Sequence, residues 1–171
     1  MVSFQRMEDK DLVRLYQEGN QQAINELIHR YKQRVYSAIF FLVRDRDLAD
    51  DLFQEAFIKI IQSLRSKHYS EQGKFLPWAL RIAHNLVIDH FRKEKLMPMQ
   101  RDTDDFSVFD IIPANNRNAA DQIIHDEKLA FVRSLLERLP FEQREVVIMR
   151  HYGGLSFKEI ARVLDININT A

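Results

Sequence analysis

The sequence predicts an all-α protein made of two small helical domains, and two observations carry this prediction. The chain has only four glycines and four prolines in 171 residues, whereas average usage would give about 20. A β-sandwich or barrel needs many turns, and the residues that make turns are scarce here. Apolar residues also recur at steps of three and four over long stretches, which is typical of amphipathic helices.

Four amphipathic segments predict a helical bundle in residues 1–96. The first segment covers about residues 9–18, and Asn20 is a suitable N-cap for the long segment that follows. Asp47 fits the N-cap of the third segment, and Pro77 fits the first turn of the fourth. The apolar stripes of four such helices suffice to close one core of about 90 residues.

The helical pattern fails in residues 97–119, which we interpret as a linker because a structureless stretch of this length does not suit the inside of a compact domain. Residues 102–126 hold six acids against one base, although the whole chain is neutral with 25 of each. Two interpretations of these acids stay open. They form either an ordinary solvated linker or an acidic strand that mimics nucleic acid and shields a basic surface.

Residues 120–171 predict a second domain built around a helix-turn-helix. Pro140 opens one helix, and Ser156 with Glu159 has the spacing of a capping box at the start of the next. A tight turn at Asp165 and a possible cap for a further helix at Asn167 follow. This pattern is typical of proteins that bind duplex DNA, although many helical corners share it.

Two polar surfaces of the first domain are candidate binding sites. The third segment places Asp51, Gln54 and Glu55 three and four residues apart, so they share one face that is either solvated or docks a basic partner. The fourth segment mixes cations, amides and aromatic rings, as single-stranded nucleic acid requires. Alternatively, the tryptophan of that segment belongs to the core, and the cations at the C-terminal end of the helix are stabilised by the negative end of the helix dipole.

Several classes of function lack support in the sequence. No cysteine is present, which excludes disulfides, Cys-ligated zinc and thiol catalysis. None of the six histidines pairs at metal-ligand spacing with a further carboxylate, so we expect no metal and no cofactor. No apolar run approaches the roughly 18 residues of a membrane span, and the charged first residues do not fit a signal peptide.

Three motifs in this order resemble bacterial RNA polymerase sigma factors of the extracytoplasmic-function (ECF) type, over nearly the whole chain. Residues 50–57 resemble the region-two segment that binds the coiled coil of the polymerase clamp. Residues 75–92 are similar to the segment that melts the promoter and recognises its −10 element. Residues 139–161 resemble region four, which recognises the −35 element.

The resemblance implies a promoter-specificity subunit without enzymatic activity, which brings core RNA polymerase to promoter DNA. It assigns core docking to Asp50, Asp51, Gln54, Glu55 and Phe57. It assigns −10 binding to Lys74, Phe75, Trp78, Arg81, Asn85, Arg92 and Lys93, and −35 binding to Lys158, Asn169 and Thr170. It also implies a cytoplasmic protein with an anti-sigma factor, which sandwiches between the two domains and can hold the sigma factor at the membrane.

Two features depart from the family pattern. Asp165 stands where the family usually has a glycine in the turn, although aspartate tolerates left-handed geometry. The family's recognition helix continues past the position of Ala171, so the sequence predicts a −35 reader truncated within its helix-turn-helix. We therefore expect residues 1–171 to bind core polymerase but not a −35 duplex.

Two rival interpretations make different predictions. A response-type regulator with a helix-turn-helix effector domain would bind duplex DNA alone and ignore polymerase. A helical interaction protein without nucleic-acid function would tolerate changes at Lys74, Arg81 and Arg92. An enzyme is a more distant third, because no apolar cleft motif surrounds the carboxylates.

Overall fold

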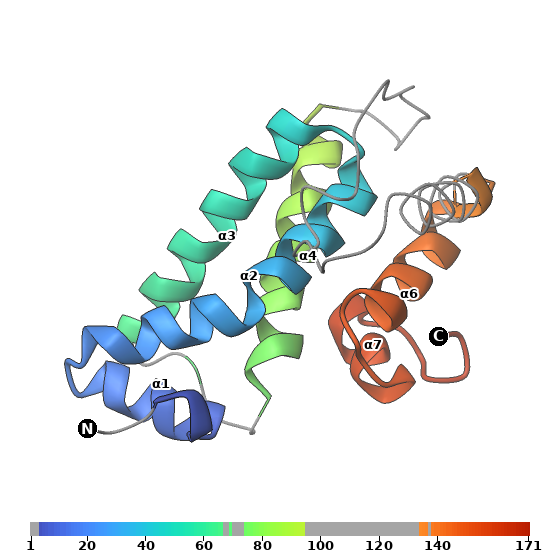
Figure 1. The fold of residues 1–171 in the computed structure, drawn as a ribbon. Helices are drawn as coiled ribbons and strands as arrows, with labels where there is room; N and C mark the ends of the chain where they lie inside the picture. The colour runs from blue at the N-terminus through green and yellow to red at the C-terminus, as the bar shows by residue number, and fades with distance from the viewer. Residues whose placement is uncertain (1–3, 67–68, 70–73, 95–133, 137) are drawn as a thin grey trace, which may run out of the picture.

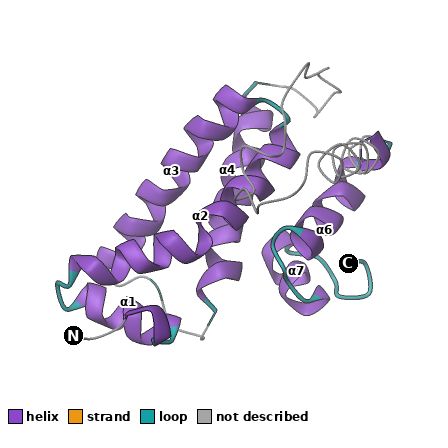
Figure 2. Ribbon diagram, viewed as in Figure 1, coloured by secondary structure: helices purple, strands orange, loops and turns teal. Residues whose placement is uncertain are grey.

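All regular structure in the described part of the chain is helical, as the sequence predicts (Figures 1 and 2). The computed structural model describes residues 4–66, 69, 74–94, 134–136 and 138–171. The elements are the 3-10 helix η1 (Phe4–Arg6) and the α-helices α1 (Asp9–Gln17), α2 (Gln21–Val43), α3 (Arg46–Arg65), α4 (Phe75–Lys93), α6 (Phe141–His151) and α7 (Phe157–Leu164). The predicted linker, residues 97–119, lies outside the described residues. Of the helix predicted after it, residues 134–136 are described and helical.

The helix starts follow local signals, with one correction. Asn20 caps α2 as predicted, because its side chain accepts a hydrogen bond of 3.0 Å from the N–H of Gln22. The prediction of Asp47 as the cap of α3 is wrong: Asp45 is the cap and accepts from the N–H of Leu48 at 3.0 Å. Asp47 instead lies in the first turn, where its carboxylate is favoured by the positive end of the helix.

The capping box of α7 is present as predicted. The N–H of Ser156 donates to Oε2 of Glu159 at 2.8 Å, and the hydroxyl of Ser156 accepts from the N–H of Glu159. Asp165 ends the helix in the left-handed conformation, with φ of +57°, a geometry that aspartate adopts more readily than most residues. The side chain of Asn167 then accepts from the N–H of Asn169 at 2.9 Å, which starts one further turn.

One continuous buried cluster joins the two predicted domains. α4 packs against α7 and α2 packs against α6, so α6 and α7 lie beside the four-helix bundle (Figure 1). Ile148, Met149 and Ile160 of α6 and α7 are fully buried in the same cluster as Leu80 of α4. The sequence left the relative packing of the two halves open, and in the structure they share a core.

Two contacts at this junction are unusually close. The rings of Phe41 and Tyr152 stack with centroids 4.2 Å apart. At Gly153, which follows α6, an added Cβ would lie 2.5 Å from the carbonyl oxygen of Met149 and 3.1 Å from Leu80. A side chain here would clash with the backbone at the end of α6 itself and would also press on Leu80 of α4, so this position favours glycine.

Candidate nucleic-acid and partner interfaces

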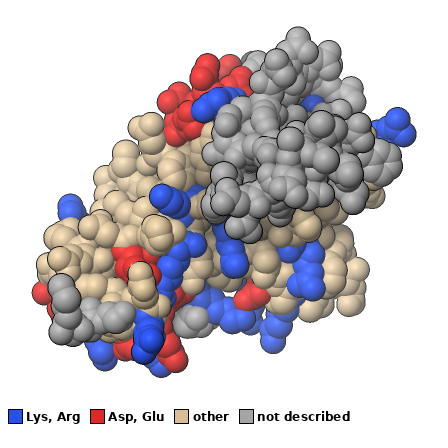
Figure 3. Space-filling view, viewed as in Figure 1, with Lys and Arg blue, Asp and Glu red and all other residues tan. Residues whose placement is uncertain are grey.

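An acidic line of side chains runs along the outer face of α3. Its members are all exposed, and each lies three or four residues from another member. We call them the α3 ridge: Asp47, Asp51, Gln54, Glu55 and Ile58. Acidic side chains gather over the start of α3 in the space-filling view (Figure 3). Ile58 is 54% exposed, which is high for so large an apolar side chain. The ridge therefore combines negative charge with one accessible apolar group.

Two residues predicted for the same docking surface are placed differently. Phe57 is only 7% exposed, and its ring packs 4.8 Å from that of Phe53, so it supports α3 from the core side instead of facing a partner. Asp50 is half-buried and hydrogen-bonds the hydroxyl of Tyr36. Burial, followed by this contact with Asp50, raises the pKa of Tyr36 to about 12. Asp50 thus has a structural partner within the domain.

Ile58 is the residue of this surface that sequence reasoning missed. The apolar stripe of α3 continues through Phe57, Ile60 and Leu64, all buried. Ile58 falls one position outside this stripe, next to Gln54 and Glu55 at helical spacing. An isoleucine that breaks the buried periodicity and joins a polar face is the signal that could have identified it.

A second line of polar side chains follows α4. Its members recur at steps of three, four and seven, so they lie along one side of the helix. We call them the α4 stripe: Lys74, Trp78, Arg81, Asn85 and Arg92. Its four polar members are exposed and Trp78 is half-buried. Lys93, also predicted to bind −10 DNA, is exposed at the end of the helix.

Trp78 stands on an aromatic platform. Its ring centroid lies 4.5 Å from that of Tyr69 and 5.7 Å from that of Phe75. Phe75 itself is fully buried and also contacts the ring of Tyr31 at 5.5 Å. The expectation that Phe75 touches DNA therefore does not fit its burial: Phe75 holds Trp78 in place, and Trp78 is the ring that remains accessible.

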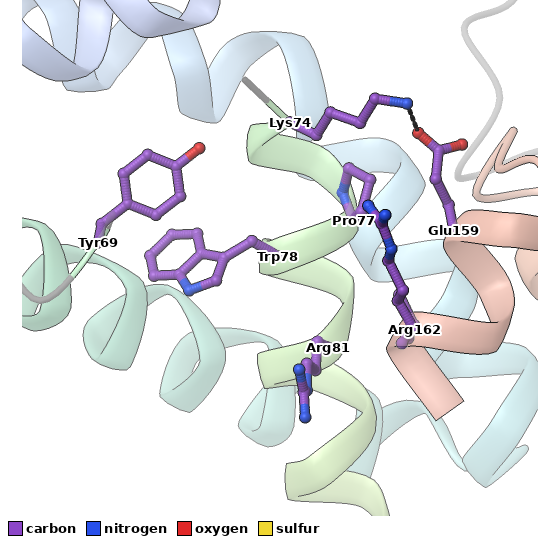
Figure 4. A pocket seen from close by; sticks show the side chains of 8 residues that line it. Tyr69, Lys74, Pro77, Trp78, Arg81, Glu159 and Arg162 are labelled. Atoms are coloured by element: carbon purple, nitrogen blue, oxygen red, sulfur yellow. Dashed lines mark hydrogen bonds and ion pairs between the residues drawn. The ribbon is translucent and has the colours of Figure 1, made fainter. Parts of the chain in front are cut away.

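The Lys74 end of the stripe meets α7. Here a hollow of about 300 Å³ lies between the two halves, lined by Tyr69, Lys74, Pro77, Trp78, Arg81, Glu159, Arg162 and Val163 (Figure 4). The ammonium group of Lys74 donates a hydrogen bond to Oε1 of Glu159, drawn as a dashed line in Figure 4. The hydrogen bond from Lys74, followed by those from Ser156, lowers the pKa of Glu159 to about 2 against its burial.

Replacing Lys74 with Met is expected to raise the pKa of Glu159 from about 2 toward its ordinary 4.5. Because the folded pKa is the lower one, the contribution of Glu159 to stability is complete above pH 4.5 and is lost as the pH falls toward about 2. The Lys74→Met variant should lose part of this acid dependence. Carboxyl ¹³C NMR titration measures the shift. Lys158→Met removes a neighbouring lysine as a control, and an unchanged Glu159 pKa in Lys74→Met would contradict the assignment.

A buried polar pair links α4 to α6. Nε2 of His84 lies 2.5 Å from Oε1 of Glu145, and each side chain is only 10% exposed. Within the described residues, Nδ1 of His84 is buried without a hydrogen-bond partner. Nearby, the rings of Phe91 and Phe141 meet edge to face at 6.1 Å. His84 lies within residues 75–92, the segment that resembles the −10-binding part of the family, and the structure places it at the junction of the two halves.

The residues predicted for −35 binding lie on the outside of the second half. Lys158 is exposed in the first turn of α7, and Asn169 and Thr170 are exposed in the turn that follows it. The guanidinium of Arg150 lies 5.3 Å from the ring centroid of Phe157, the residue before Lys158 in the chain. The three predicted residues are thus accessible. They lie in or after α7, whereas the α4 stripe lies on α4.

Metal ligands and membrane-spanning helices are absent from the described ranges. No group of three or more His, Cys, Asp or Glu residues there is arranged to hold a metal ion. None of the helices in these ranges combines the length and apolar character that crossing a membrane requires.

Comparison with known proteins identifies the family. Residues 27–96 match Sigma-70 region 2, and residues 132–171 match Sigma-70 region 4. The chain is 30% identical to the ECF RNA polymerase sigma-E factor of Escherichia coli (strain K12), with 97% of this chain and 87% of that protein covered. The chain belongs to the ECF sigma factors of RNA polymerase. As a sigma factor it directs RNA polymerase to promoters, and its region 2 contains both the α3 ridge and the α4 stripe.

Other similarities agree with this sigma-factor family. The ECF sigma factor SigW of Bacillus subtilis (strain 168) is 27% identical, over 94% of this chain and 87% of that one. The ECF sigma factor SigE of Mycolicibacterium smegmatis is 33% identical over 89% of this chain. The matched part covers 58% of the length of SigE. The solved structure of CnrH in complex with the cytosolic domain of CnrY has a TM-score of 0.64 at 24% identity and supports the fold, covering 94% of this chain and 85% of that one.

Proposed function

We propose that this sigma factor docks on core RNA polymerase through the α3 ridge, captures the opened −10 strand with the α4 stripe, and catalyses no reaction itself. The observation that carries the proposal is that region 2 bears two distinct exposed surfaces on separate helices. One is acidic with an apolar group, and the other is cationic with an aromatic platform. A subunit that joins a protein to a nucleic acid needs these two chemistries side by side.

The α3 ridge fits a basic helical partner. Asp51, Gln54 and Glu55 present acceptors along one line, and Ile58 adds an apolar anchor among them. Interfaces of this kind draw most of their affinity from a few desolvated anchors, with charges that set orientation and association rate. The coiled coil of the polymerase clamp is the partner that the family resemblance indicates. Pull-down of purified core polymerase by the chain tests this docking. A well-folded chain that fails to bind core would contradict this docking role.

The α4 stripe fits a single strand of DNA. From Lys74 to Arg92 it extends about 27 Å along the helix, with cations at both ends for phosphates. Trp78 offers a ring face in the first turn, and stacking on such a face is worth about 1–3 kcal/mol per base. That amount offsets the few kcal/mol needed to take a base out of the duplex. The arrangement therefore supports capture of melted −10 DNA.

Replacing Trp78 with Ala is expected to weaken binding of pre-melted promoter DNA by the holoenzyme about tenfold, because one stacking surface is lost. Core docking should be unchanged, since α3 is not altered. The probe is a DNA duplex with an unpaired bubble, selected from a random pool for binding to the wild-type holoenzyme. Filter binding of the wild-type and variant holoenzymes to this probe measures the change in affinity. Trp78→Phe keeps a ring and should recover most of the affinity. Equal binding by the Ala variant and the wild type would contradict a stacking role.

Region 4 and the remaining partners complete the proposal. We propose that Lys158, Asn169 and Thr170 belong to the −35-binding surface, and that residues 97–119 link region 2 to region 4. A protein inhibitor of the anti-sigma type is also proposed, supported by the solved complex of CnrH with the cytosolic domain of CnrY. The sigma factor would act in the cytoplasm, where it meets polymerase and promoters.

A further inference from the structure

We propose that the hollow between α4 and α7 is a binding site for a free nucleoside monophosphate, with the base on Trp78 and the phosphate on Arg162. The site goes beyond the proposed function, because it includes a residue of region 4 and takes a small molecule instead of a strand. Its consequence for DNA binding rests on the proposed stacking role of Trp78. Small-molecule sites are clefts of about 300–1,000 Å³ that often lie between domains, and this hollow of about 300 Å³ has such a place and size.

One side of the hollow is an aromatic wall. Tyr69 and Trp78 both line it, with ring centroids 4.5 Å apart, and Figure 4 shows the two rings next to each other. The fully buried ring of Phe75 lies 5.7 Å from that of Trp78 and fixes its position. Nucleobases stack on aromatic side chains of this kind whatever their sequence, because every base has a flat π-face. The wall is therefore preorganised to hold the base of a nucleotide.

The hollow also has unpaired positive charge. Three cations and one carboxylate line it: Lys74, Arg81, Arg162 and Glu159. Lys74 is paired with Glu159. Within the described part of the chain, the guanidinium groups of Arg81 and Arg162 have no hydrogen-bond or ion-pair partner. Because a phosphate monoester carries a charge of about −1.5 to −2 at pH 7, one nucleoside monophosphate would balance the two unpaired arginines.

Arg162 is the residue placed to bind the phosphate. Its side chain extends from α7 toward Pro77 in the first turn of α4, whereas the side chain of Arg81 points away from Pro77 (Figure 4). A guanidinium offers a planar fork of donors that matches the oxygens of a phosphate. The base would then lie against region 2 and the phosphate against region 4, so the ligand would need side chains of both regions.

A nucleotide in this site would compete with promoter DNA for the ring of Trp78. The same face cannot stack a free base and a base of the −10 strand at once. By linkage, the nucleotide and the strand must weaken each other's binding by the same factor. The concentration of free nucleotide would thus set how readily the free sigma factor binds single strands.

Fluorescence of Trp78 measures this binding directly, because the chain has a single tryptophan. Titration with AMP should quench the emission saturably, and calorimetry should give one AMP bound per chain. Adenosine lacks the phosphate and inorganic phosphate lacks the base, so each should bind at least about tenfold more weakly than AMP. The absence of saturable quenching by AMP would overturn the site. Adenosine or inorganic phosphate that bound as tightly as AMP would overturn the ligand class.

A matched pair of variants tests the phosphate contact. Arg162→Gln keeps a polar side chain without the charge and should weaken AMP binding about tenfold or more. Arg138→Gln makes the same change at an exposed arginine that does not line the hollow, and it should bind AMP like the wild type. Thermal melts by circular dichroism check that both variants are folded. Unchanged AMP binding by Arg162→Gln, or an equal loss in Arg138→Gln, would overturn the role of Arg162.

Binding of a fluorescent oligothymidylate distinguishes this site from the proposed function. Saturating AMP should weaken binding of the oligonucleotide to the wild-type chain at least about fivefold. At the same AMP concentration the Arg162→Gln chain should be affected clearly less. Oligonucleotide binding that AMP does not change would overturn the competition. If neither the chain nor the holoenzyme bound single strands even without AMP, the proposed function of the α4 stripe would fail, whereas saturable quenching by AMP would still support the nucleotide site.

Discussion

The Asp51→Arg, Gln54→Ala double variant is expected to lose pull-down of core RNA polymerase. Both side chains are exposed on the α3 ridge, so the changes leave the core of region 2 intact. The new arginine would face a basic partner, and breaking one buried charge pair at an interface costs about 2–5 kcal/mol. At 1.4 kcal/mol per factor of ten, the affinity should fall about 30-fold or more. Biolayer interferometry with purified core measures the change in Kd.

A control with the same chemistry can be made elsewhere on region 2. Glu18→Arg with Gln22→Ala changes two exposed residues where α1 meets α2. This variant carries the same change in charge and should bind core like the wild type. If the two double variants lost affinity equally, net charge and not the α3 ridge would be responsible.

The fold was predictable because its signals are local. Helical periodicity and the scarcity of glycine and proline suffice for the all-α class, and the caps at Asn20 and Ser156 are short motifs with a direct hydrogen-bonding reason. The start of α3 was misplaced by two residues because Asp45 and Asp47 are both good cap residues. The structure decides between them, because it is the side chain of Asp45 that accepts from the N–H of Leu48.

The site was predictable to the level of a helix face but not of a contact. Spacing places Asp51, Gln54 and Glu55 together, and the structure keeps them on one exposed line. Spacing does not predict how far each side chain of the helix is buried. In the structure Phe57 is buried and Ile58 is exposed. Contacts between residues far apart in the chain, such as His84 with Glu145, depend on how the two halves pack. No local pattern encodes them.

The Phe75→Ala variant is expected to lose about 3–5 kcal/mol in free energy of unfolding, because it removes a fully buried ring from the core. The cavity would open beside Tyr31, Tyr69 and Trp78, whose rings all contact Phe75. Urea denaturation followed by circular dichroism measures the loss. Phe75→Leu fills most of the volume and should cost clearly less.

Comparison of this variant with Trp78→Ala distinguishes a supporting ring from a binding ring. Phe75 is fully buried, so its truncation should reduce stability strongly and affect DNA binding only through the position of Trp78. Trp78 is half-buried, so its truncation should cost less stability and more DNA affinity. A Phe75→Leu holoenzyme should then bind melted promoter DNA nearly as well as the wild type. If Phe75→Leu were as stable as the wild type but lost DNA binding as fully as Trp78→Ala, Phe75 would have to contact the strand directly.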